Sequence, residues 1–427
     1  MLPRAGNDDP RRSTEIATRR PKTEPRGLSQ PSLLTTRIML RDFAQEILNA
    51  EARHLRRRLC VAESPAETTI TIKGRSLISM ASNNYLGLAN HRAVKQAAME
   101  AIAKWGVGAG AARLISGTMT PHEQLEQALA RFKQVEAVLT YATGYTTNVG
   151  LLPALSDRNG LTLVDRSCHA SLIQACRVSN ATLRVFHHND VGHLETVLSK
   201  RGKARPALVV TEGVFSMDGD LAPLAELLTL CHRYDATLLV DDAHGTGVMG
   251  EHGRGTAEHF GLNPQALIQM GTLSKAIGTS GGYVAGTTSL KDYLINTSKT
   301  FIYTTASPPA IAAAATAAIQ IIRHEPERRA RLWDNRRYLH EALQGMGFHL
   351  TRTQSPILPI LVKSPETALK MSQALYEAGV YVPAIRPPTV PRHSSRLRLT
   401  VSSEHTTEQL ERVVQALREA GEAMRVL

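Results

Sequence analysis

Cysteine is scarce in this sequence, with four residues in a chain of 427. The four are scattered, and none belongs to a C-x-x-C pair. Dispersed thiols in this number cannot staple a long chain, so a disulfide scaffold is excluded and no metal site is expected. A reducing compartment suits such a sequence, and we expect the protein to work in the cytoplasm. The cysteines are Cys60, Cys168, Cys176 and Cys231.

A long apolar run is also missing. The most apolar stretch, residues 306–322, is interrupted by Pro308, Pro309, Thr316 and Gln320. Many of its other residues are alanines, whose transfer into lipid gains little free energy. The stretch therefore predicts a packed helix rather than a membrane span, and we expect no membrane association.

Aromatic residues make up only 4% of the chain, which leaves little to stack on nucleic-acid bases. The charge is positive, with 50 Lys and Arg against 38 Asp and Glu, a net charge of +12. A third of this surplus lies in residues 1–38, and no nucleic-acid-reading motif is present. We therefore do not expect nucleic acid as a partner. A basic surface can equally attract small polyanions such as phosphates or coenzyme A.

Composition and periodicity divide the chain into four segments. Residues 1–38 are rich in proline and lack apolar periodicity, which indicates a disordered tail or a mis-called start before Met39. Residues 39–80 are expected to form an N-terminal helix and small strands, because Phe43, Ile47 and Leu48 recur at helical spacing. Residues 81–310 predict a large domain, and residues 311–427 a smaller C-terminal α/β domain.

Short β-rich runs alternate with amphipathic helical stretches in the large domain, for example the helix expected over 224–231. The last strands recur at about 30 residues, the length of a βαβ unit, so we predict an α/β fold with a mostly parallel central sheet. In the C-terminal part, helices are expected over 325–344 and 407–424, with strands near 357–362 and 396–400. The strands expected in the large domain are 137–141, 161–164, 207–211, 237–240 and 267–270.

Polar side chains follow four of these strands at the point where each strand ends. Since ligands of parallel α/β sheets bind beyond the carboxyl ends of the strands, we expect these side chains to meet at one edge. Each has an ordinary alternative explanation, such as a helix cap or a solvated loop residue, but their convergence favours a site. In chain order, the residues that follow the four strands are His169, then Glu212 and Ser216, then Asp241 and His244, and finally Thr272, Ser274 and Lys275; we call these segments the strand exits.

A lysine, a carboxylate and an imidazole in one site suit chemistry on an aldehyde cofactor. A lysine amine forms a Schiff base with an aldehyde once its pKa is lowered, and pyridoxal phosphate supplies both the aldehyde and an electron-accepting ring. In this interpretation Lys275 is the amine and Asp241 keeps the ring nitrogen protonated. His244 would reach the ring hydroxyl, and His169 would stack on the ring.

A phosphate-binding segment is expected at residues 143–148, where a strand ends, Gly144 permits close backbone approach and a helix follows. Hydroxyls of Thr272 and Ser274 could add donors. The glycines at 106, 108 and 110 superficially match a dinucleotide fingerprint, but they follow a helical stretch rather than a strand, so that interpretation is weak.

Several ordered motifs resemble those of the α-oxoamine synthases, pyridoxal-phosphate enzymes that condense an amino acid with an acyl thioester and release carbon dioxide. The resemblance runs from about Met39 to the C-terminus. It implies the aspartate-aminotransferase-like fold, pyridoxal-phosphate-dependent transferase fold type I, with 81–310 as the cofactor-binding domain. The motifs are SNNYLG at 82–87, TEGVFSMDG at 211–219, VDDAHGTG at 240–247 and TLSKA at 272–276.

Two further motifs, AIRPPTVP at 384–391 and RLRLT at 396–400, most resemble the members that join L-alanine to a pimeloyl thioester in biotin synthesis. The thioester carrier, coenzyme A or acyl carrier protein, stays open. The stretch GAARLISG at 110–117 is less glycine-rich than in some of these members. The alternative is therefore the sibling that condenses glycine with acetyl-CoA. A non-enzymatic anion binder is a third and more distant reading.

The resemblance also implies roles for individual residues around the cofactor. Lys275 would hold it covalently and move protons, Asp241 would pair with its ring nitrogen, and His169 would stack on the ring and act as an acid. Its other contacts would come from Ser216, His244, Gly144, Tyr145 and Thr272.

On the substrate side, the resemblance implies that Arg398 takes the amino-acid carboxylate, for which a guanidinium fork is suited. Glu212 and Asn83 would line the substrate site. The acyl substrate would contact Arg56 and Thr389, with Arg386 nearby. The family works as a homodimer with shared active sites, so Thr305 is expected to reach the partner's phosphate.

Overall fold

The structure is a computed structural model that describes residues 42–202 and 205–427. The chain divides into two units, residues 1–49 and 50–427. Of the first unit only the beginning of helix α1 (Phe43–Ala52) is described, and this helix buries none of its residues. It confirms the helical spacing predicted there. The interpretation of residues 1–38 as a tail or mis-called start lies outside the described residues.

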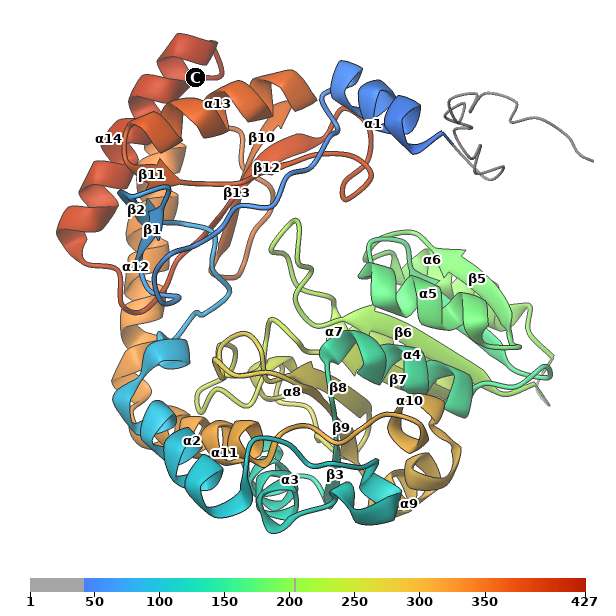
Figure 1. The fold of residues 1–427 in the computed structure, drawn as a ribbon. Helices are drawn as coiled ribbons and strands as arrows, with labels where there is room; N and C mark the ends of the chain where they lie inside the picture. The colour runs from blue at the N-terminus through green and yellow to red at the C-terminus, as the bar shows by residue number, and fades with distance from the viewer. Residues whose placement is uncertain (1–41, 203–204) are drawn as a thin grey trace, which may run out of the picture. The chain divides into compact units, whose positions relative to one another are not determined.

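A seven-stranded sheet forms the centre of the second unit (Figure 1). Strands β4 to β8 run parallel in the spatial order β8-β7-β6-β4-β5, and β9 lies antiparallel between β8 and β3. The predicted mostly parallel sheet is therefore confirmed. The strands are β3 (Ala137–Tyr141), β4 (Leu161–Asp165), β5 (Thr182–Phe186), β6 (Ala207–Glu212), β7 (Ala236–Asp241), β8 (Ile268–Thr272) and β9 (Gly282–Gly286).

The central strands are buried along most of their length, as expected when helices cover both faces of a parallel sheet. Helix α4 packs on β8 and β9, α5 on β4, and α7 on β7. The predicted packed helix at 306–322 is confirmed as α11, which lies against α2 and α3. These helices are α2 (Arg92–Trp105), α3 (Thr120–Lys133), α4 (Gly144–Leu155), α5 (Ala170–Val178), α6 (Val191–Ser199), α7 (Leu224–Arg233), α8 (Thr256–His259), α9 (Thr288–Thr297), α10 (Lys299–Ile302) and α11 (Pro309–His324).

The C-terminal part contains an antiparallel sheet in the order β10-β13-β12. Strand β11 instead pairs in parallel with β2, which pairs with β1, so the N-terminal strands share a sheet with the C-terminal part. The division at residues 80 and 310 stays a prediction. The elements are β1 (Thr69–Ile72), β2 (Arg75–Ser79), β10 (Ile357–Lys363), β11 (Val380–Tyr381), β12 (Ala384–Ile385), β13 (Ser395–Thr400), α12 (Pro326–Gly345), α13 (Pro365–Glu377) and α14 (Thr407–Met424).

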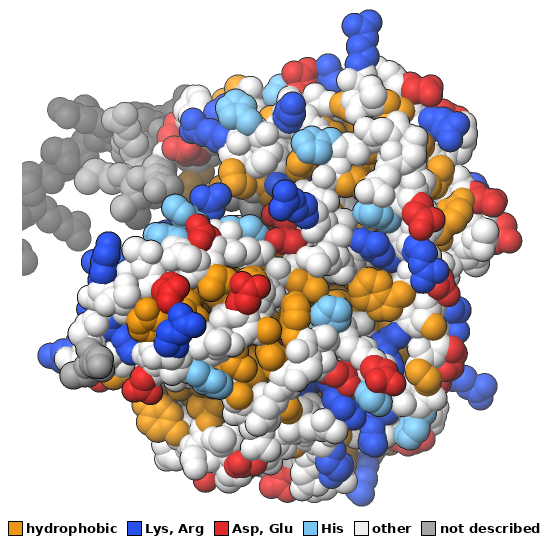
Figure 2. Space-filling view, turned by 180° about the vertical axis from the view of Figure 1, so that it is seen from behind, with side chains coloured by type: hydrophobic (Ala, Val, Ile, Leu, Met, Phe, Trp, Pro, Cys, Tyr) orange, Lys and Arg blue, Asp and Glu red, His pale blue; other side chains and the backbone are white. Residues whose placement is uncertain are grey.

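The distribution of surface charge and the apolar content of the helices concern the expectations about nucleic acid and membranes. On the face shown in Figure 2, Lys and Arg side chains are interspersed with Asp and Glu, so the positive surplus does not gather there into one basic stripe. Among the residues that the structure describes, no helix is both long and apolar enough to cross a bilayer.

Candidate active site

A cavity of about 240 Å³ lies at the carboxyl ends of β4, β6, β7 and β8. Parallel neighbours end at the same edge of a sheet, which is why the four strand exits predicted to converge do so. The cavity brings together ten of the predicted site residues: Gly144, Tyr145, His169, Glu212, Ser216, Asp241, His244, Thr272, Ser274 and Lys275.

Lys275 lies just beyond β8 and faces two carboxyl groups, Glu212 and Asp241, which are register partners at the ends of β6 and β7. Within the described chain its amine makes no hydrogen bond. Burial lowers the pKa of Lys275 to about 8, against the opposing effect of Asp241 and Glu212. Burial and the charge of Asp241 raise the pKa of Glu212 to about 8. A fraction of the lysine is therefore a neutral nucleophile near pH 7 to 8.

Asp241 is buried and rigidly held. Its Oδ1 accepts a hydrogen bond from the backbone N–H of Ala243 at 3.0 Å, and its Oδ2 accepts one from Asn148 Nδ2 at 2.9 Å. Asn148 Nδ2 also donates to Ser171 Oγ at 2.9 Å. Sequence reasoning gave Asn148 no role beside Asp241, although it stood at the end of the segment proposed for phosphate. The contact between Asn148 on α4 and Asp241 at the end of β7 could not be seen in the sequence.

His244 is buried, and its Nδ1 lies 2.8 Å from the hydroxyl of Tyr85. Burial holds the pKa of His244 well below its usual value, with Lys275 and Arg398 acting in the same direction, so the ring is neutral. Tyr85 was quoted in the SNNYLG motif but was assigned no role. The resemblance of that motif was the one indication that it lies near the site.

His169 caps helix α5, because its Nδ1 accepts from the backbone N–H of Ser171 at 3.2 Å. The backbone N–H of His169 donates to Glu212 Oε1 at 2.5 Å, which ties the exits of β4 and β6 together. Its ring lies edge-on to that of Tyr145, with 6.5 Å between centroids. With Nδ1 engaged, Nε2 is the nitrogen available to a ligand.

The first turn of α4 borders the cavity with free backbone donors. Thr143 caps the helix by accepting from the N–H of Thr146 at 3.0 Å, which leaves the N–H groups of Gly144 and Tyr145 without an intrahelical acceptor. A Cβ at Gly144 would lie 3.3 Å from the side chain of Thr272, so glycine allows this close packing. A helix start of this kind attracts a phosphate.

Arg398 on β13 is buried and reaches the same region. Its Nε donates to the backbone oxygen of Ser216 at 2.6 Å, and its Nη1 donates to Asn83 Oδ1 at 3.2 Å. The guanidinium also acts on the pKa of Lys275 and of His244, lowering both. Arg398, Asn83 and Ser216 thus form one cluster beside the cavity.

Three other predicted residues gather outside the cavity. Arg386 donates to the backbone oxygen of Arg56 at 3.3 Å, while the side chain of Arg56 pairs with Glu51 at 2.5 Å. Thr389 is contacted by Arg57, whose Nη2 donates to its hydroxyl at 3.1 Å. These residues lie together, but they do not line the cavity that contains Lys275.

Thr305 lies apart from the lysine as well. It lines a small separate cavity together with Arg113 and His122, and it forms a bridge to Ala112. Thr305 therefore does not line the cavity that contains Lys275.

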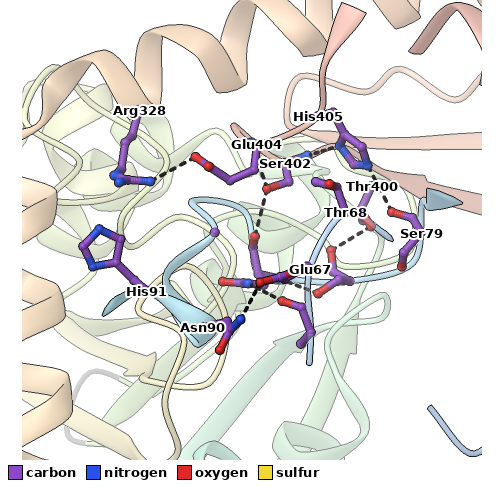
Figure 3. A pocket seen from close by; sticks show the side chains of 14 residues that line it. Glu67, Thr68, Ser79, Asn90, His91, Arg328, Thr400, Ser402, Glu404 and His405 are labelled. Atoms are coloured by element: carbon purple, nitrogen blue, oxygen red, sulfur yellow. Dashed lines mark hydrogen bonds and ion pairs between the residues drawn. The ribbon is translucent and has the colours of Figure 1, made fainter. Parts of the chain in front are cut away.

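A larger cavity, of about 320 Å³, is lined by residues from both ends of the chain (Figure 3). Two of its charged groups are paired with each other, since Arg328 Nη1 donates to Glu404 Oε1 at 2.9 Å. Burial lowers the pKa of His405 to about 4, so this imidazole is neutral there. None of the predicted site residues lines it, which leaves the lysine cavity as the candidate site.

Comparisons with known proteins identify the family of the chain. Residues 75–417 match the family model described as aminotransferase class I and II. The 8-amino-7-oxononanoate synthase of Thermoanaerobacter pseudethanolicus is 45% identical over 372 residues, covering 87% of this chain and 94% of the relative. The enzyme of the same name from Bacillus pumilus is 43% identical over 365 residues, covering 86% and 93%.

Solved structures give the same result. Serine palmitoyltransferase from S. paucimobilis, with a bound PLP–myriocin aldimine, matches with a TM-score of 0.86 and 34% identity, over 90% of this chain and 98% of that one. The 8-amino-7-oxononanoate synthase from Francisella tularensis matches with a TM-score of 0.71 and 26% identity, over 82% and 99%.

The chain therefore belongs to the class I and II aminotransferase family, with the pyridoxal-phosphate-dependent fold that the sequence predicted. Its curated relatives place it within that family among the 8-amino-7-oxononanoate synthases.

The residues of the cavity fit pyridoxal phosphate. The amine of Lys275, which has no hydrogen-bond partner among the described residues, lines the cavity together with the held carboxylate of Asp241. The oxygen of Asn148 is buried and unpaired beside that carboxylate, so the cavity has polar capacity not used by the protein itself. The free N–H groups at the start of α4 suit the phosphate.

Proposed function

We propose that the protein uses pyridoxal phosphate to condense L-alanine with a pimeloyl thioester, releasing carbon dioxide and the free thiol and forming 8-amino-7-oxononanoate for biotin synthesis. The observation that carries the proposal is the amine of Lys275, with its lowered pKa, in one cavity with the carboxyl groups of Asp241 and Glu212 and the start of helix α4. The names of the relatives support the choice of substrates.

Bound pyridoxal phosphate supplies an aldehyde that forms Schiff bases with amines and a ring that accepts electrons from the amino-acid Cα. Lys275 would hold it and, once displaced by the amino group of alanine, would serve as the base for the Cα proton. A base with a pKa of about 8 is well matched to proton transfer near neutral pH. The same amine would return a proton to that carbon after carbon dioxide leaves.

Asp241 would accept the hydrogen bond of the ring nitrogen and keep that nitrogen protonated. Its position is fixed by Asn148 and by the N–H of Ala243, so little reorganisation is needed. His244 stays neutral through burial, and with Nδ1 engaged by Tyr85 its Nε2 would be free for the cofactor's oxygen. His169 would face the ring and assist as an acid.

The alanine carboxylate would bind to Arg398, whose guanidinium is buried and already oriented by Ser216 and Asn83. Anchoring the carboxylate leaves the Cα–H bond free to face Lys275. Glu212 would line the same space. The pimeloyl group would extend toward Arg56, Arg386 and Thr389, which are grouped together outside the lysine cavity.

The reaction balances with one proton taken up from water, because one proton leaves Cα and two are needed, one by the thiolate and one by Cα. The Cα–H bond of alanine breaks, and the Cα bonds to the thioester carbonyl while the C–S bond breaks and the thiolate takes a proton. The bond from Cα to the carboxylate then breaks, and Cα takes back a proton. Lys275 is the group of this chain placed to carry both Cα protons.

We further propose a homodimer with shared active sites, in which Thr305 serves the partner's phosphate. In the single chain Thr305 does not line the lysine cavity, and Ile115 and Tyr303 are 80% and 81% exposed. All four cysteines are free, which agrees with a reducing cytoplasm as the working compartment.

The test is a direct assay of thiol and carbon dioxide release. L-Alanine with pimeloyl-CoA, and with pimeloyl-acyl carrier protein, should give both products, and 8-amino-7-oxononanoate should be found by mass spectrometry. Glycine with acetyl-CoA is the competing pair. If that pair is turned over with a higher kcat/KM than either alanine pair, the proposed substrates are wrong and the glycine-specific sibling is favoured.

A further inference from the structure

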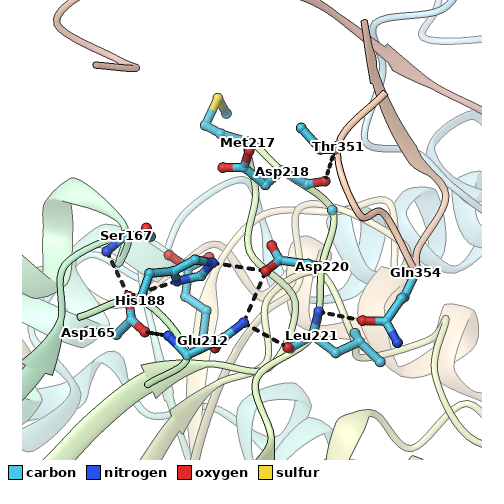
Figure 4. Close-up of polar contacts among 12 residues, drawn as sticks. Asp165, Ser167, His188, Glu212, Met217, Asp218, Asp220, Leu221, Thr351 and Gln354 are labelled. Atoms are coloured by element: carbon cyan, nitrogen blue, oxygen red, sulfur yellow. Dashed lines mark hydrogen bonds and ion pairs between the residues drawn. The ribbon is translucent and has the colours of Figure 1, made fainter. Parts of the chain in front are cut away.

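His188 lies just after β5 and bridges two carboxylates (Figure 4). Its Nδ1 is 3.0 Å from Asp165 Oδ1, at the end of β4, and its Nε2 is 2.9 Å from Asp220 Oδ2. Because both partners are acceptors, both ring nitrogens must carry protons, and the ring is a cation. Burial lowers the pKa of His188, but the two carboxylates outweigh it and raise the pKa to about 10.

The segment on the Asp220 side is a closed loop, residues 213–221, which we call the Ser216 loop. It is closed by a bond from the N–H of Phe215 to the oxygen of Asp220 at 2.9 Å and by a bridge between Val214 and Leu221. The ring of His188 lies edge-on against Phe215, with 4.4 Å between centroids. His188 therefore touches this loop at both ends of its closing bond.

Asp165 is a hydrogen-bond partner of His188 that is itself held in place. This carboxylate is fully buried, and besides His188 it accepts from the N–H of Ser167 and from the N–H of Asn189, each at 2.8 Å. Asn189 also donates from Nδ2 to Asp220 Oδ2 at 3.0 Å. The loop is thereby connected to the end of β4 through charged, partly buried contacts.

The Ser216 loop also accepts hydrogen bonds from two arginines of β13. Arg398 donates to the oxygen of Ser216, and Arg396 donates to the oxygen of Met217 at 2.9 Å and to the carboxylate of Asp218 at 2.6 Å. The loop is thus held between His188 on the large sheet and the arginines on β13. A shift of the loop would move the acceptor that orients the guanidinium of Arg398.

We propose that His188 is a positioning residue for the amino-acid substrate: by clamping Asp220 and Phe215 it fixes the Ser216 loop and, through the oxygen of Ser216, the direction of the Arg398 guanidinium. This rests on the proposed function, which gives Arg398 the alanine carboxylate. Glutamine in place of His188 has its donors on one nitrogen only, so it cannot donate to Asp165 and Asp220 in the arrangement of the imidazolium.

The test uses the cofactor-loaded protein and measures alanine binding from the change in cofactor absorbance, without turnover. His188→Gln should bind cofactor normally but should weaken alanine binding about 10- to 100-fold, while the KM for the thioester changes less than about threefold, since effects of this size are typical of displaced charge-assisted contacts. The matched control is His187→Gln, the same change at the adjacent histidine, whose side chain is 64% exposed. It should leave alanine binding unchanged.

A role confined to stability would lower the melting temperature of His188→Gln and leave its alanine affinity within twofold of the unchanged protein, and this result would overturn the proposal. If His188→Gln is insoluble, Asp220→Asn decides instead. It removes one of the two charge-assisted contacts and keeps the shape, so it should weaken alanine binding in the same direction, and an unchanged affinity would overturn the proposal equally.

Arg398→Lys distinguishes a failure of the role proposed for Arg398 from a failure of the role proposed for His188. If it leaves alanine binding unchanged, the assigned role of Arg398 is wrong, whatever His188 does. If it weakens alanine binding while His188→Gln does not, the inference alone fails. In the double variant, the two effects should combine to less than their product, because one acts through the other.

Discussion

The buried pair of Lys133 and Asp242 gives the sharpest prediction of stability. Lys133 ends α3 with a side chain that is 1% exposed, and its Nζ lies 3.1 Å from Asp242 Oδ2 and also donates to the oxygen of Arg254. Burial lowers the pKa of Lys133, but Tyr283 and Asp242 outweigh it and raise the net value, so the amine stays charged. Asp242 follows the proposed ring-nitrogen partner directly in the chain.

Removing one charge leaves the other buried without its counter-ion. Lys133→Met should therefore lower the free energy of unfolding by about 3–5 kcal/mol, and Asp242→Asn by a similar amount. In Lys133→Met, Asp242 still accepts hydrogen bonds from the N–H and the hydroxyl of Thr256, at 3.1 and 2.7 Å, so its carboxylate keeps two of its bonds. In the double variant no charge is left buried, and we expect it to recover at least about 2 kcal/mol relative to the sum of the single changes.

The assay is denaturant unfolding followed by circular dichroism at one fixed protein concentration. Lys370→Met is the control, because Lys370 forms an exposed pair with Glu366 at 2.8 Å that should contribute less than about 0.5 kcal/mol. Single changes at Lys133 and Asp242 that each cost less than about 1 kcal/mol, or that add without coupling, would refute the reasoning.

Three further predictions concern the site. Lys275→Ala should abolish turnover and the absorbance of covalently held cofactor, whereas the exposed Lys95→Ala should keep both; retained activity in the first variant would contradict the assignment. Since the pKa of Lys275 is lowered to about 8, the rate of covalent cofactor uptake by the apoprotein should rise with pH as the amine loses its proton, reach half its plateau near pH 8 and level off about one pH unit higher, and a rise that continues to pH 10 would be the contrary result. Arg398→Lys, which keeps the charge but loses the fork, should weaken alanine binding about 10- to 100-fold, and Arg392→Lys should not. Equal losses of affinity for alanine and for the thioester would argue against a role of Arg398 in binding the alanine carboxylate.

The strand exits were predictable because the sequence carries two independent regularities there. Apolar runs of strand length recur at the spacing of βαβ units, and polar residues follow each run directly. Two other strands of the sheet were less predictable. The edge strand β5 is half exposed and includes Arg184, and the buried inner strand β9 begins and ends with glycine, so neither has the continuous apolar run of the predicted strands.

The residues that sequence reasoning missed are those whose partners lie far away in the chain. Asn148 meets Asp241 across 93 residues, and Tyr85 meets His244 across 159. A motif states which residues occur together in a segment, but not which segments come into contact. His188 is the strongest example, since a histidine after an edge strand has no local feature that distinguishes it from a surface residue.

The pairing of β2 with β11 has a consequence for how the chain is made. Ile78 and its partner Val380 are separated by about 300 residues. At a synthesis rate of about 5–20 residues per second, the N-terminal hairpin waits about 15–60 s on the ribosome for its third strand. During that time Ile70, Ile72 and Leu77 lack the cover that Tyr376 and Tyr381 later provide. Nascent chains that stop before residue 380 should therefore expose an unpaired, aggregation-prone edge of the hairpin and need chaperones to remain soluble.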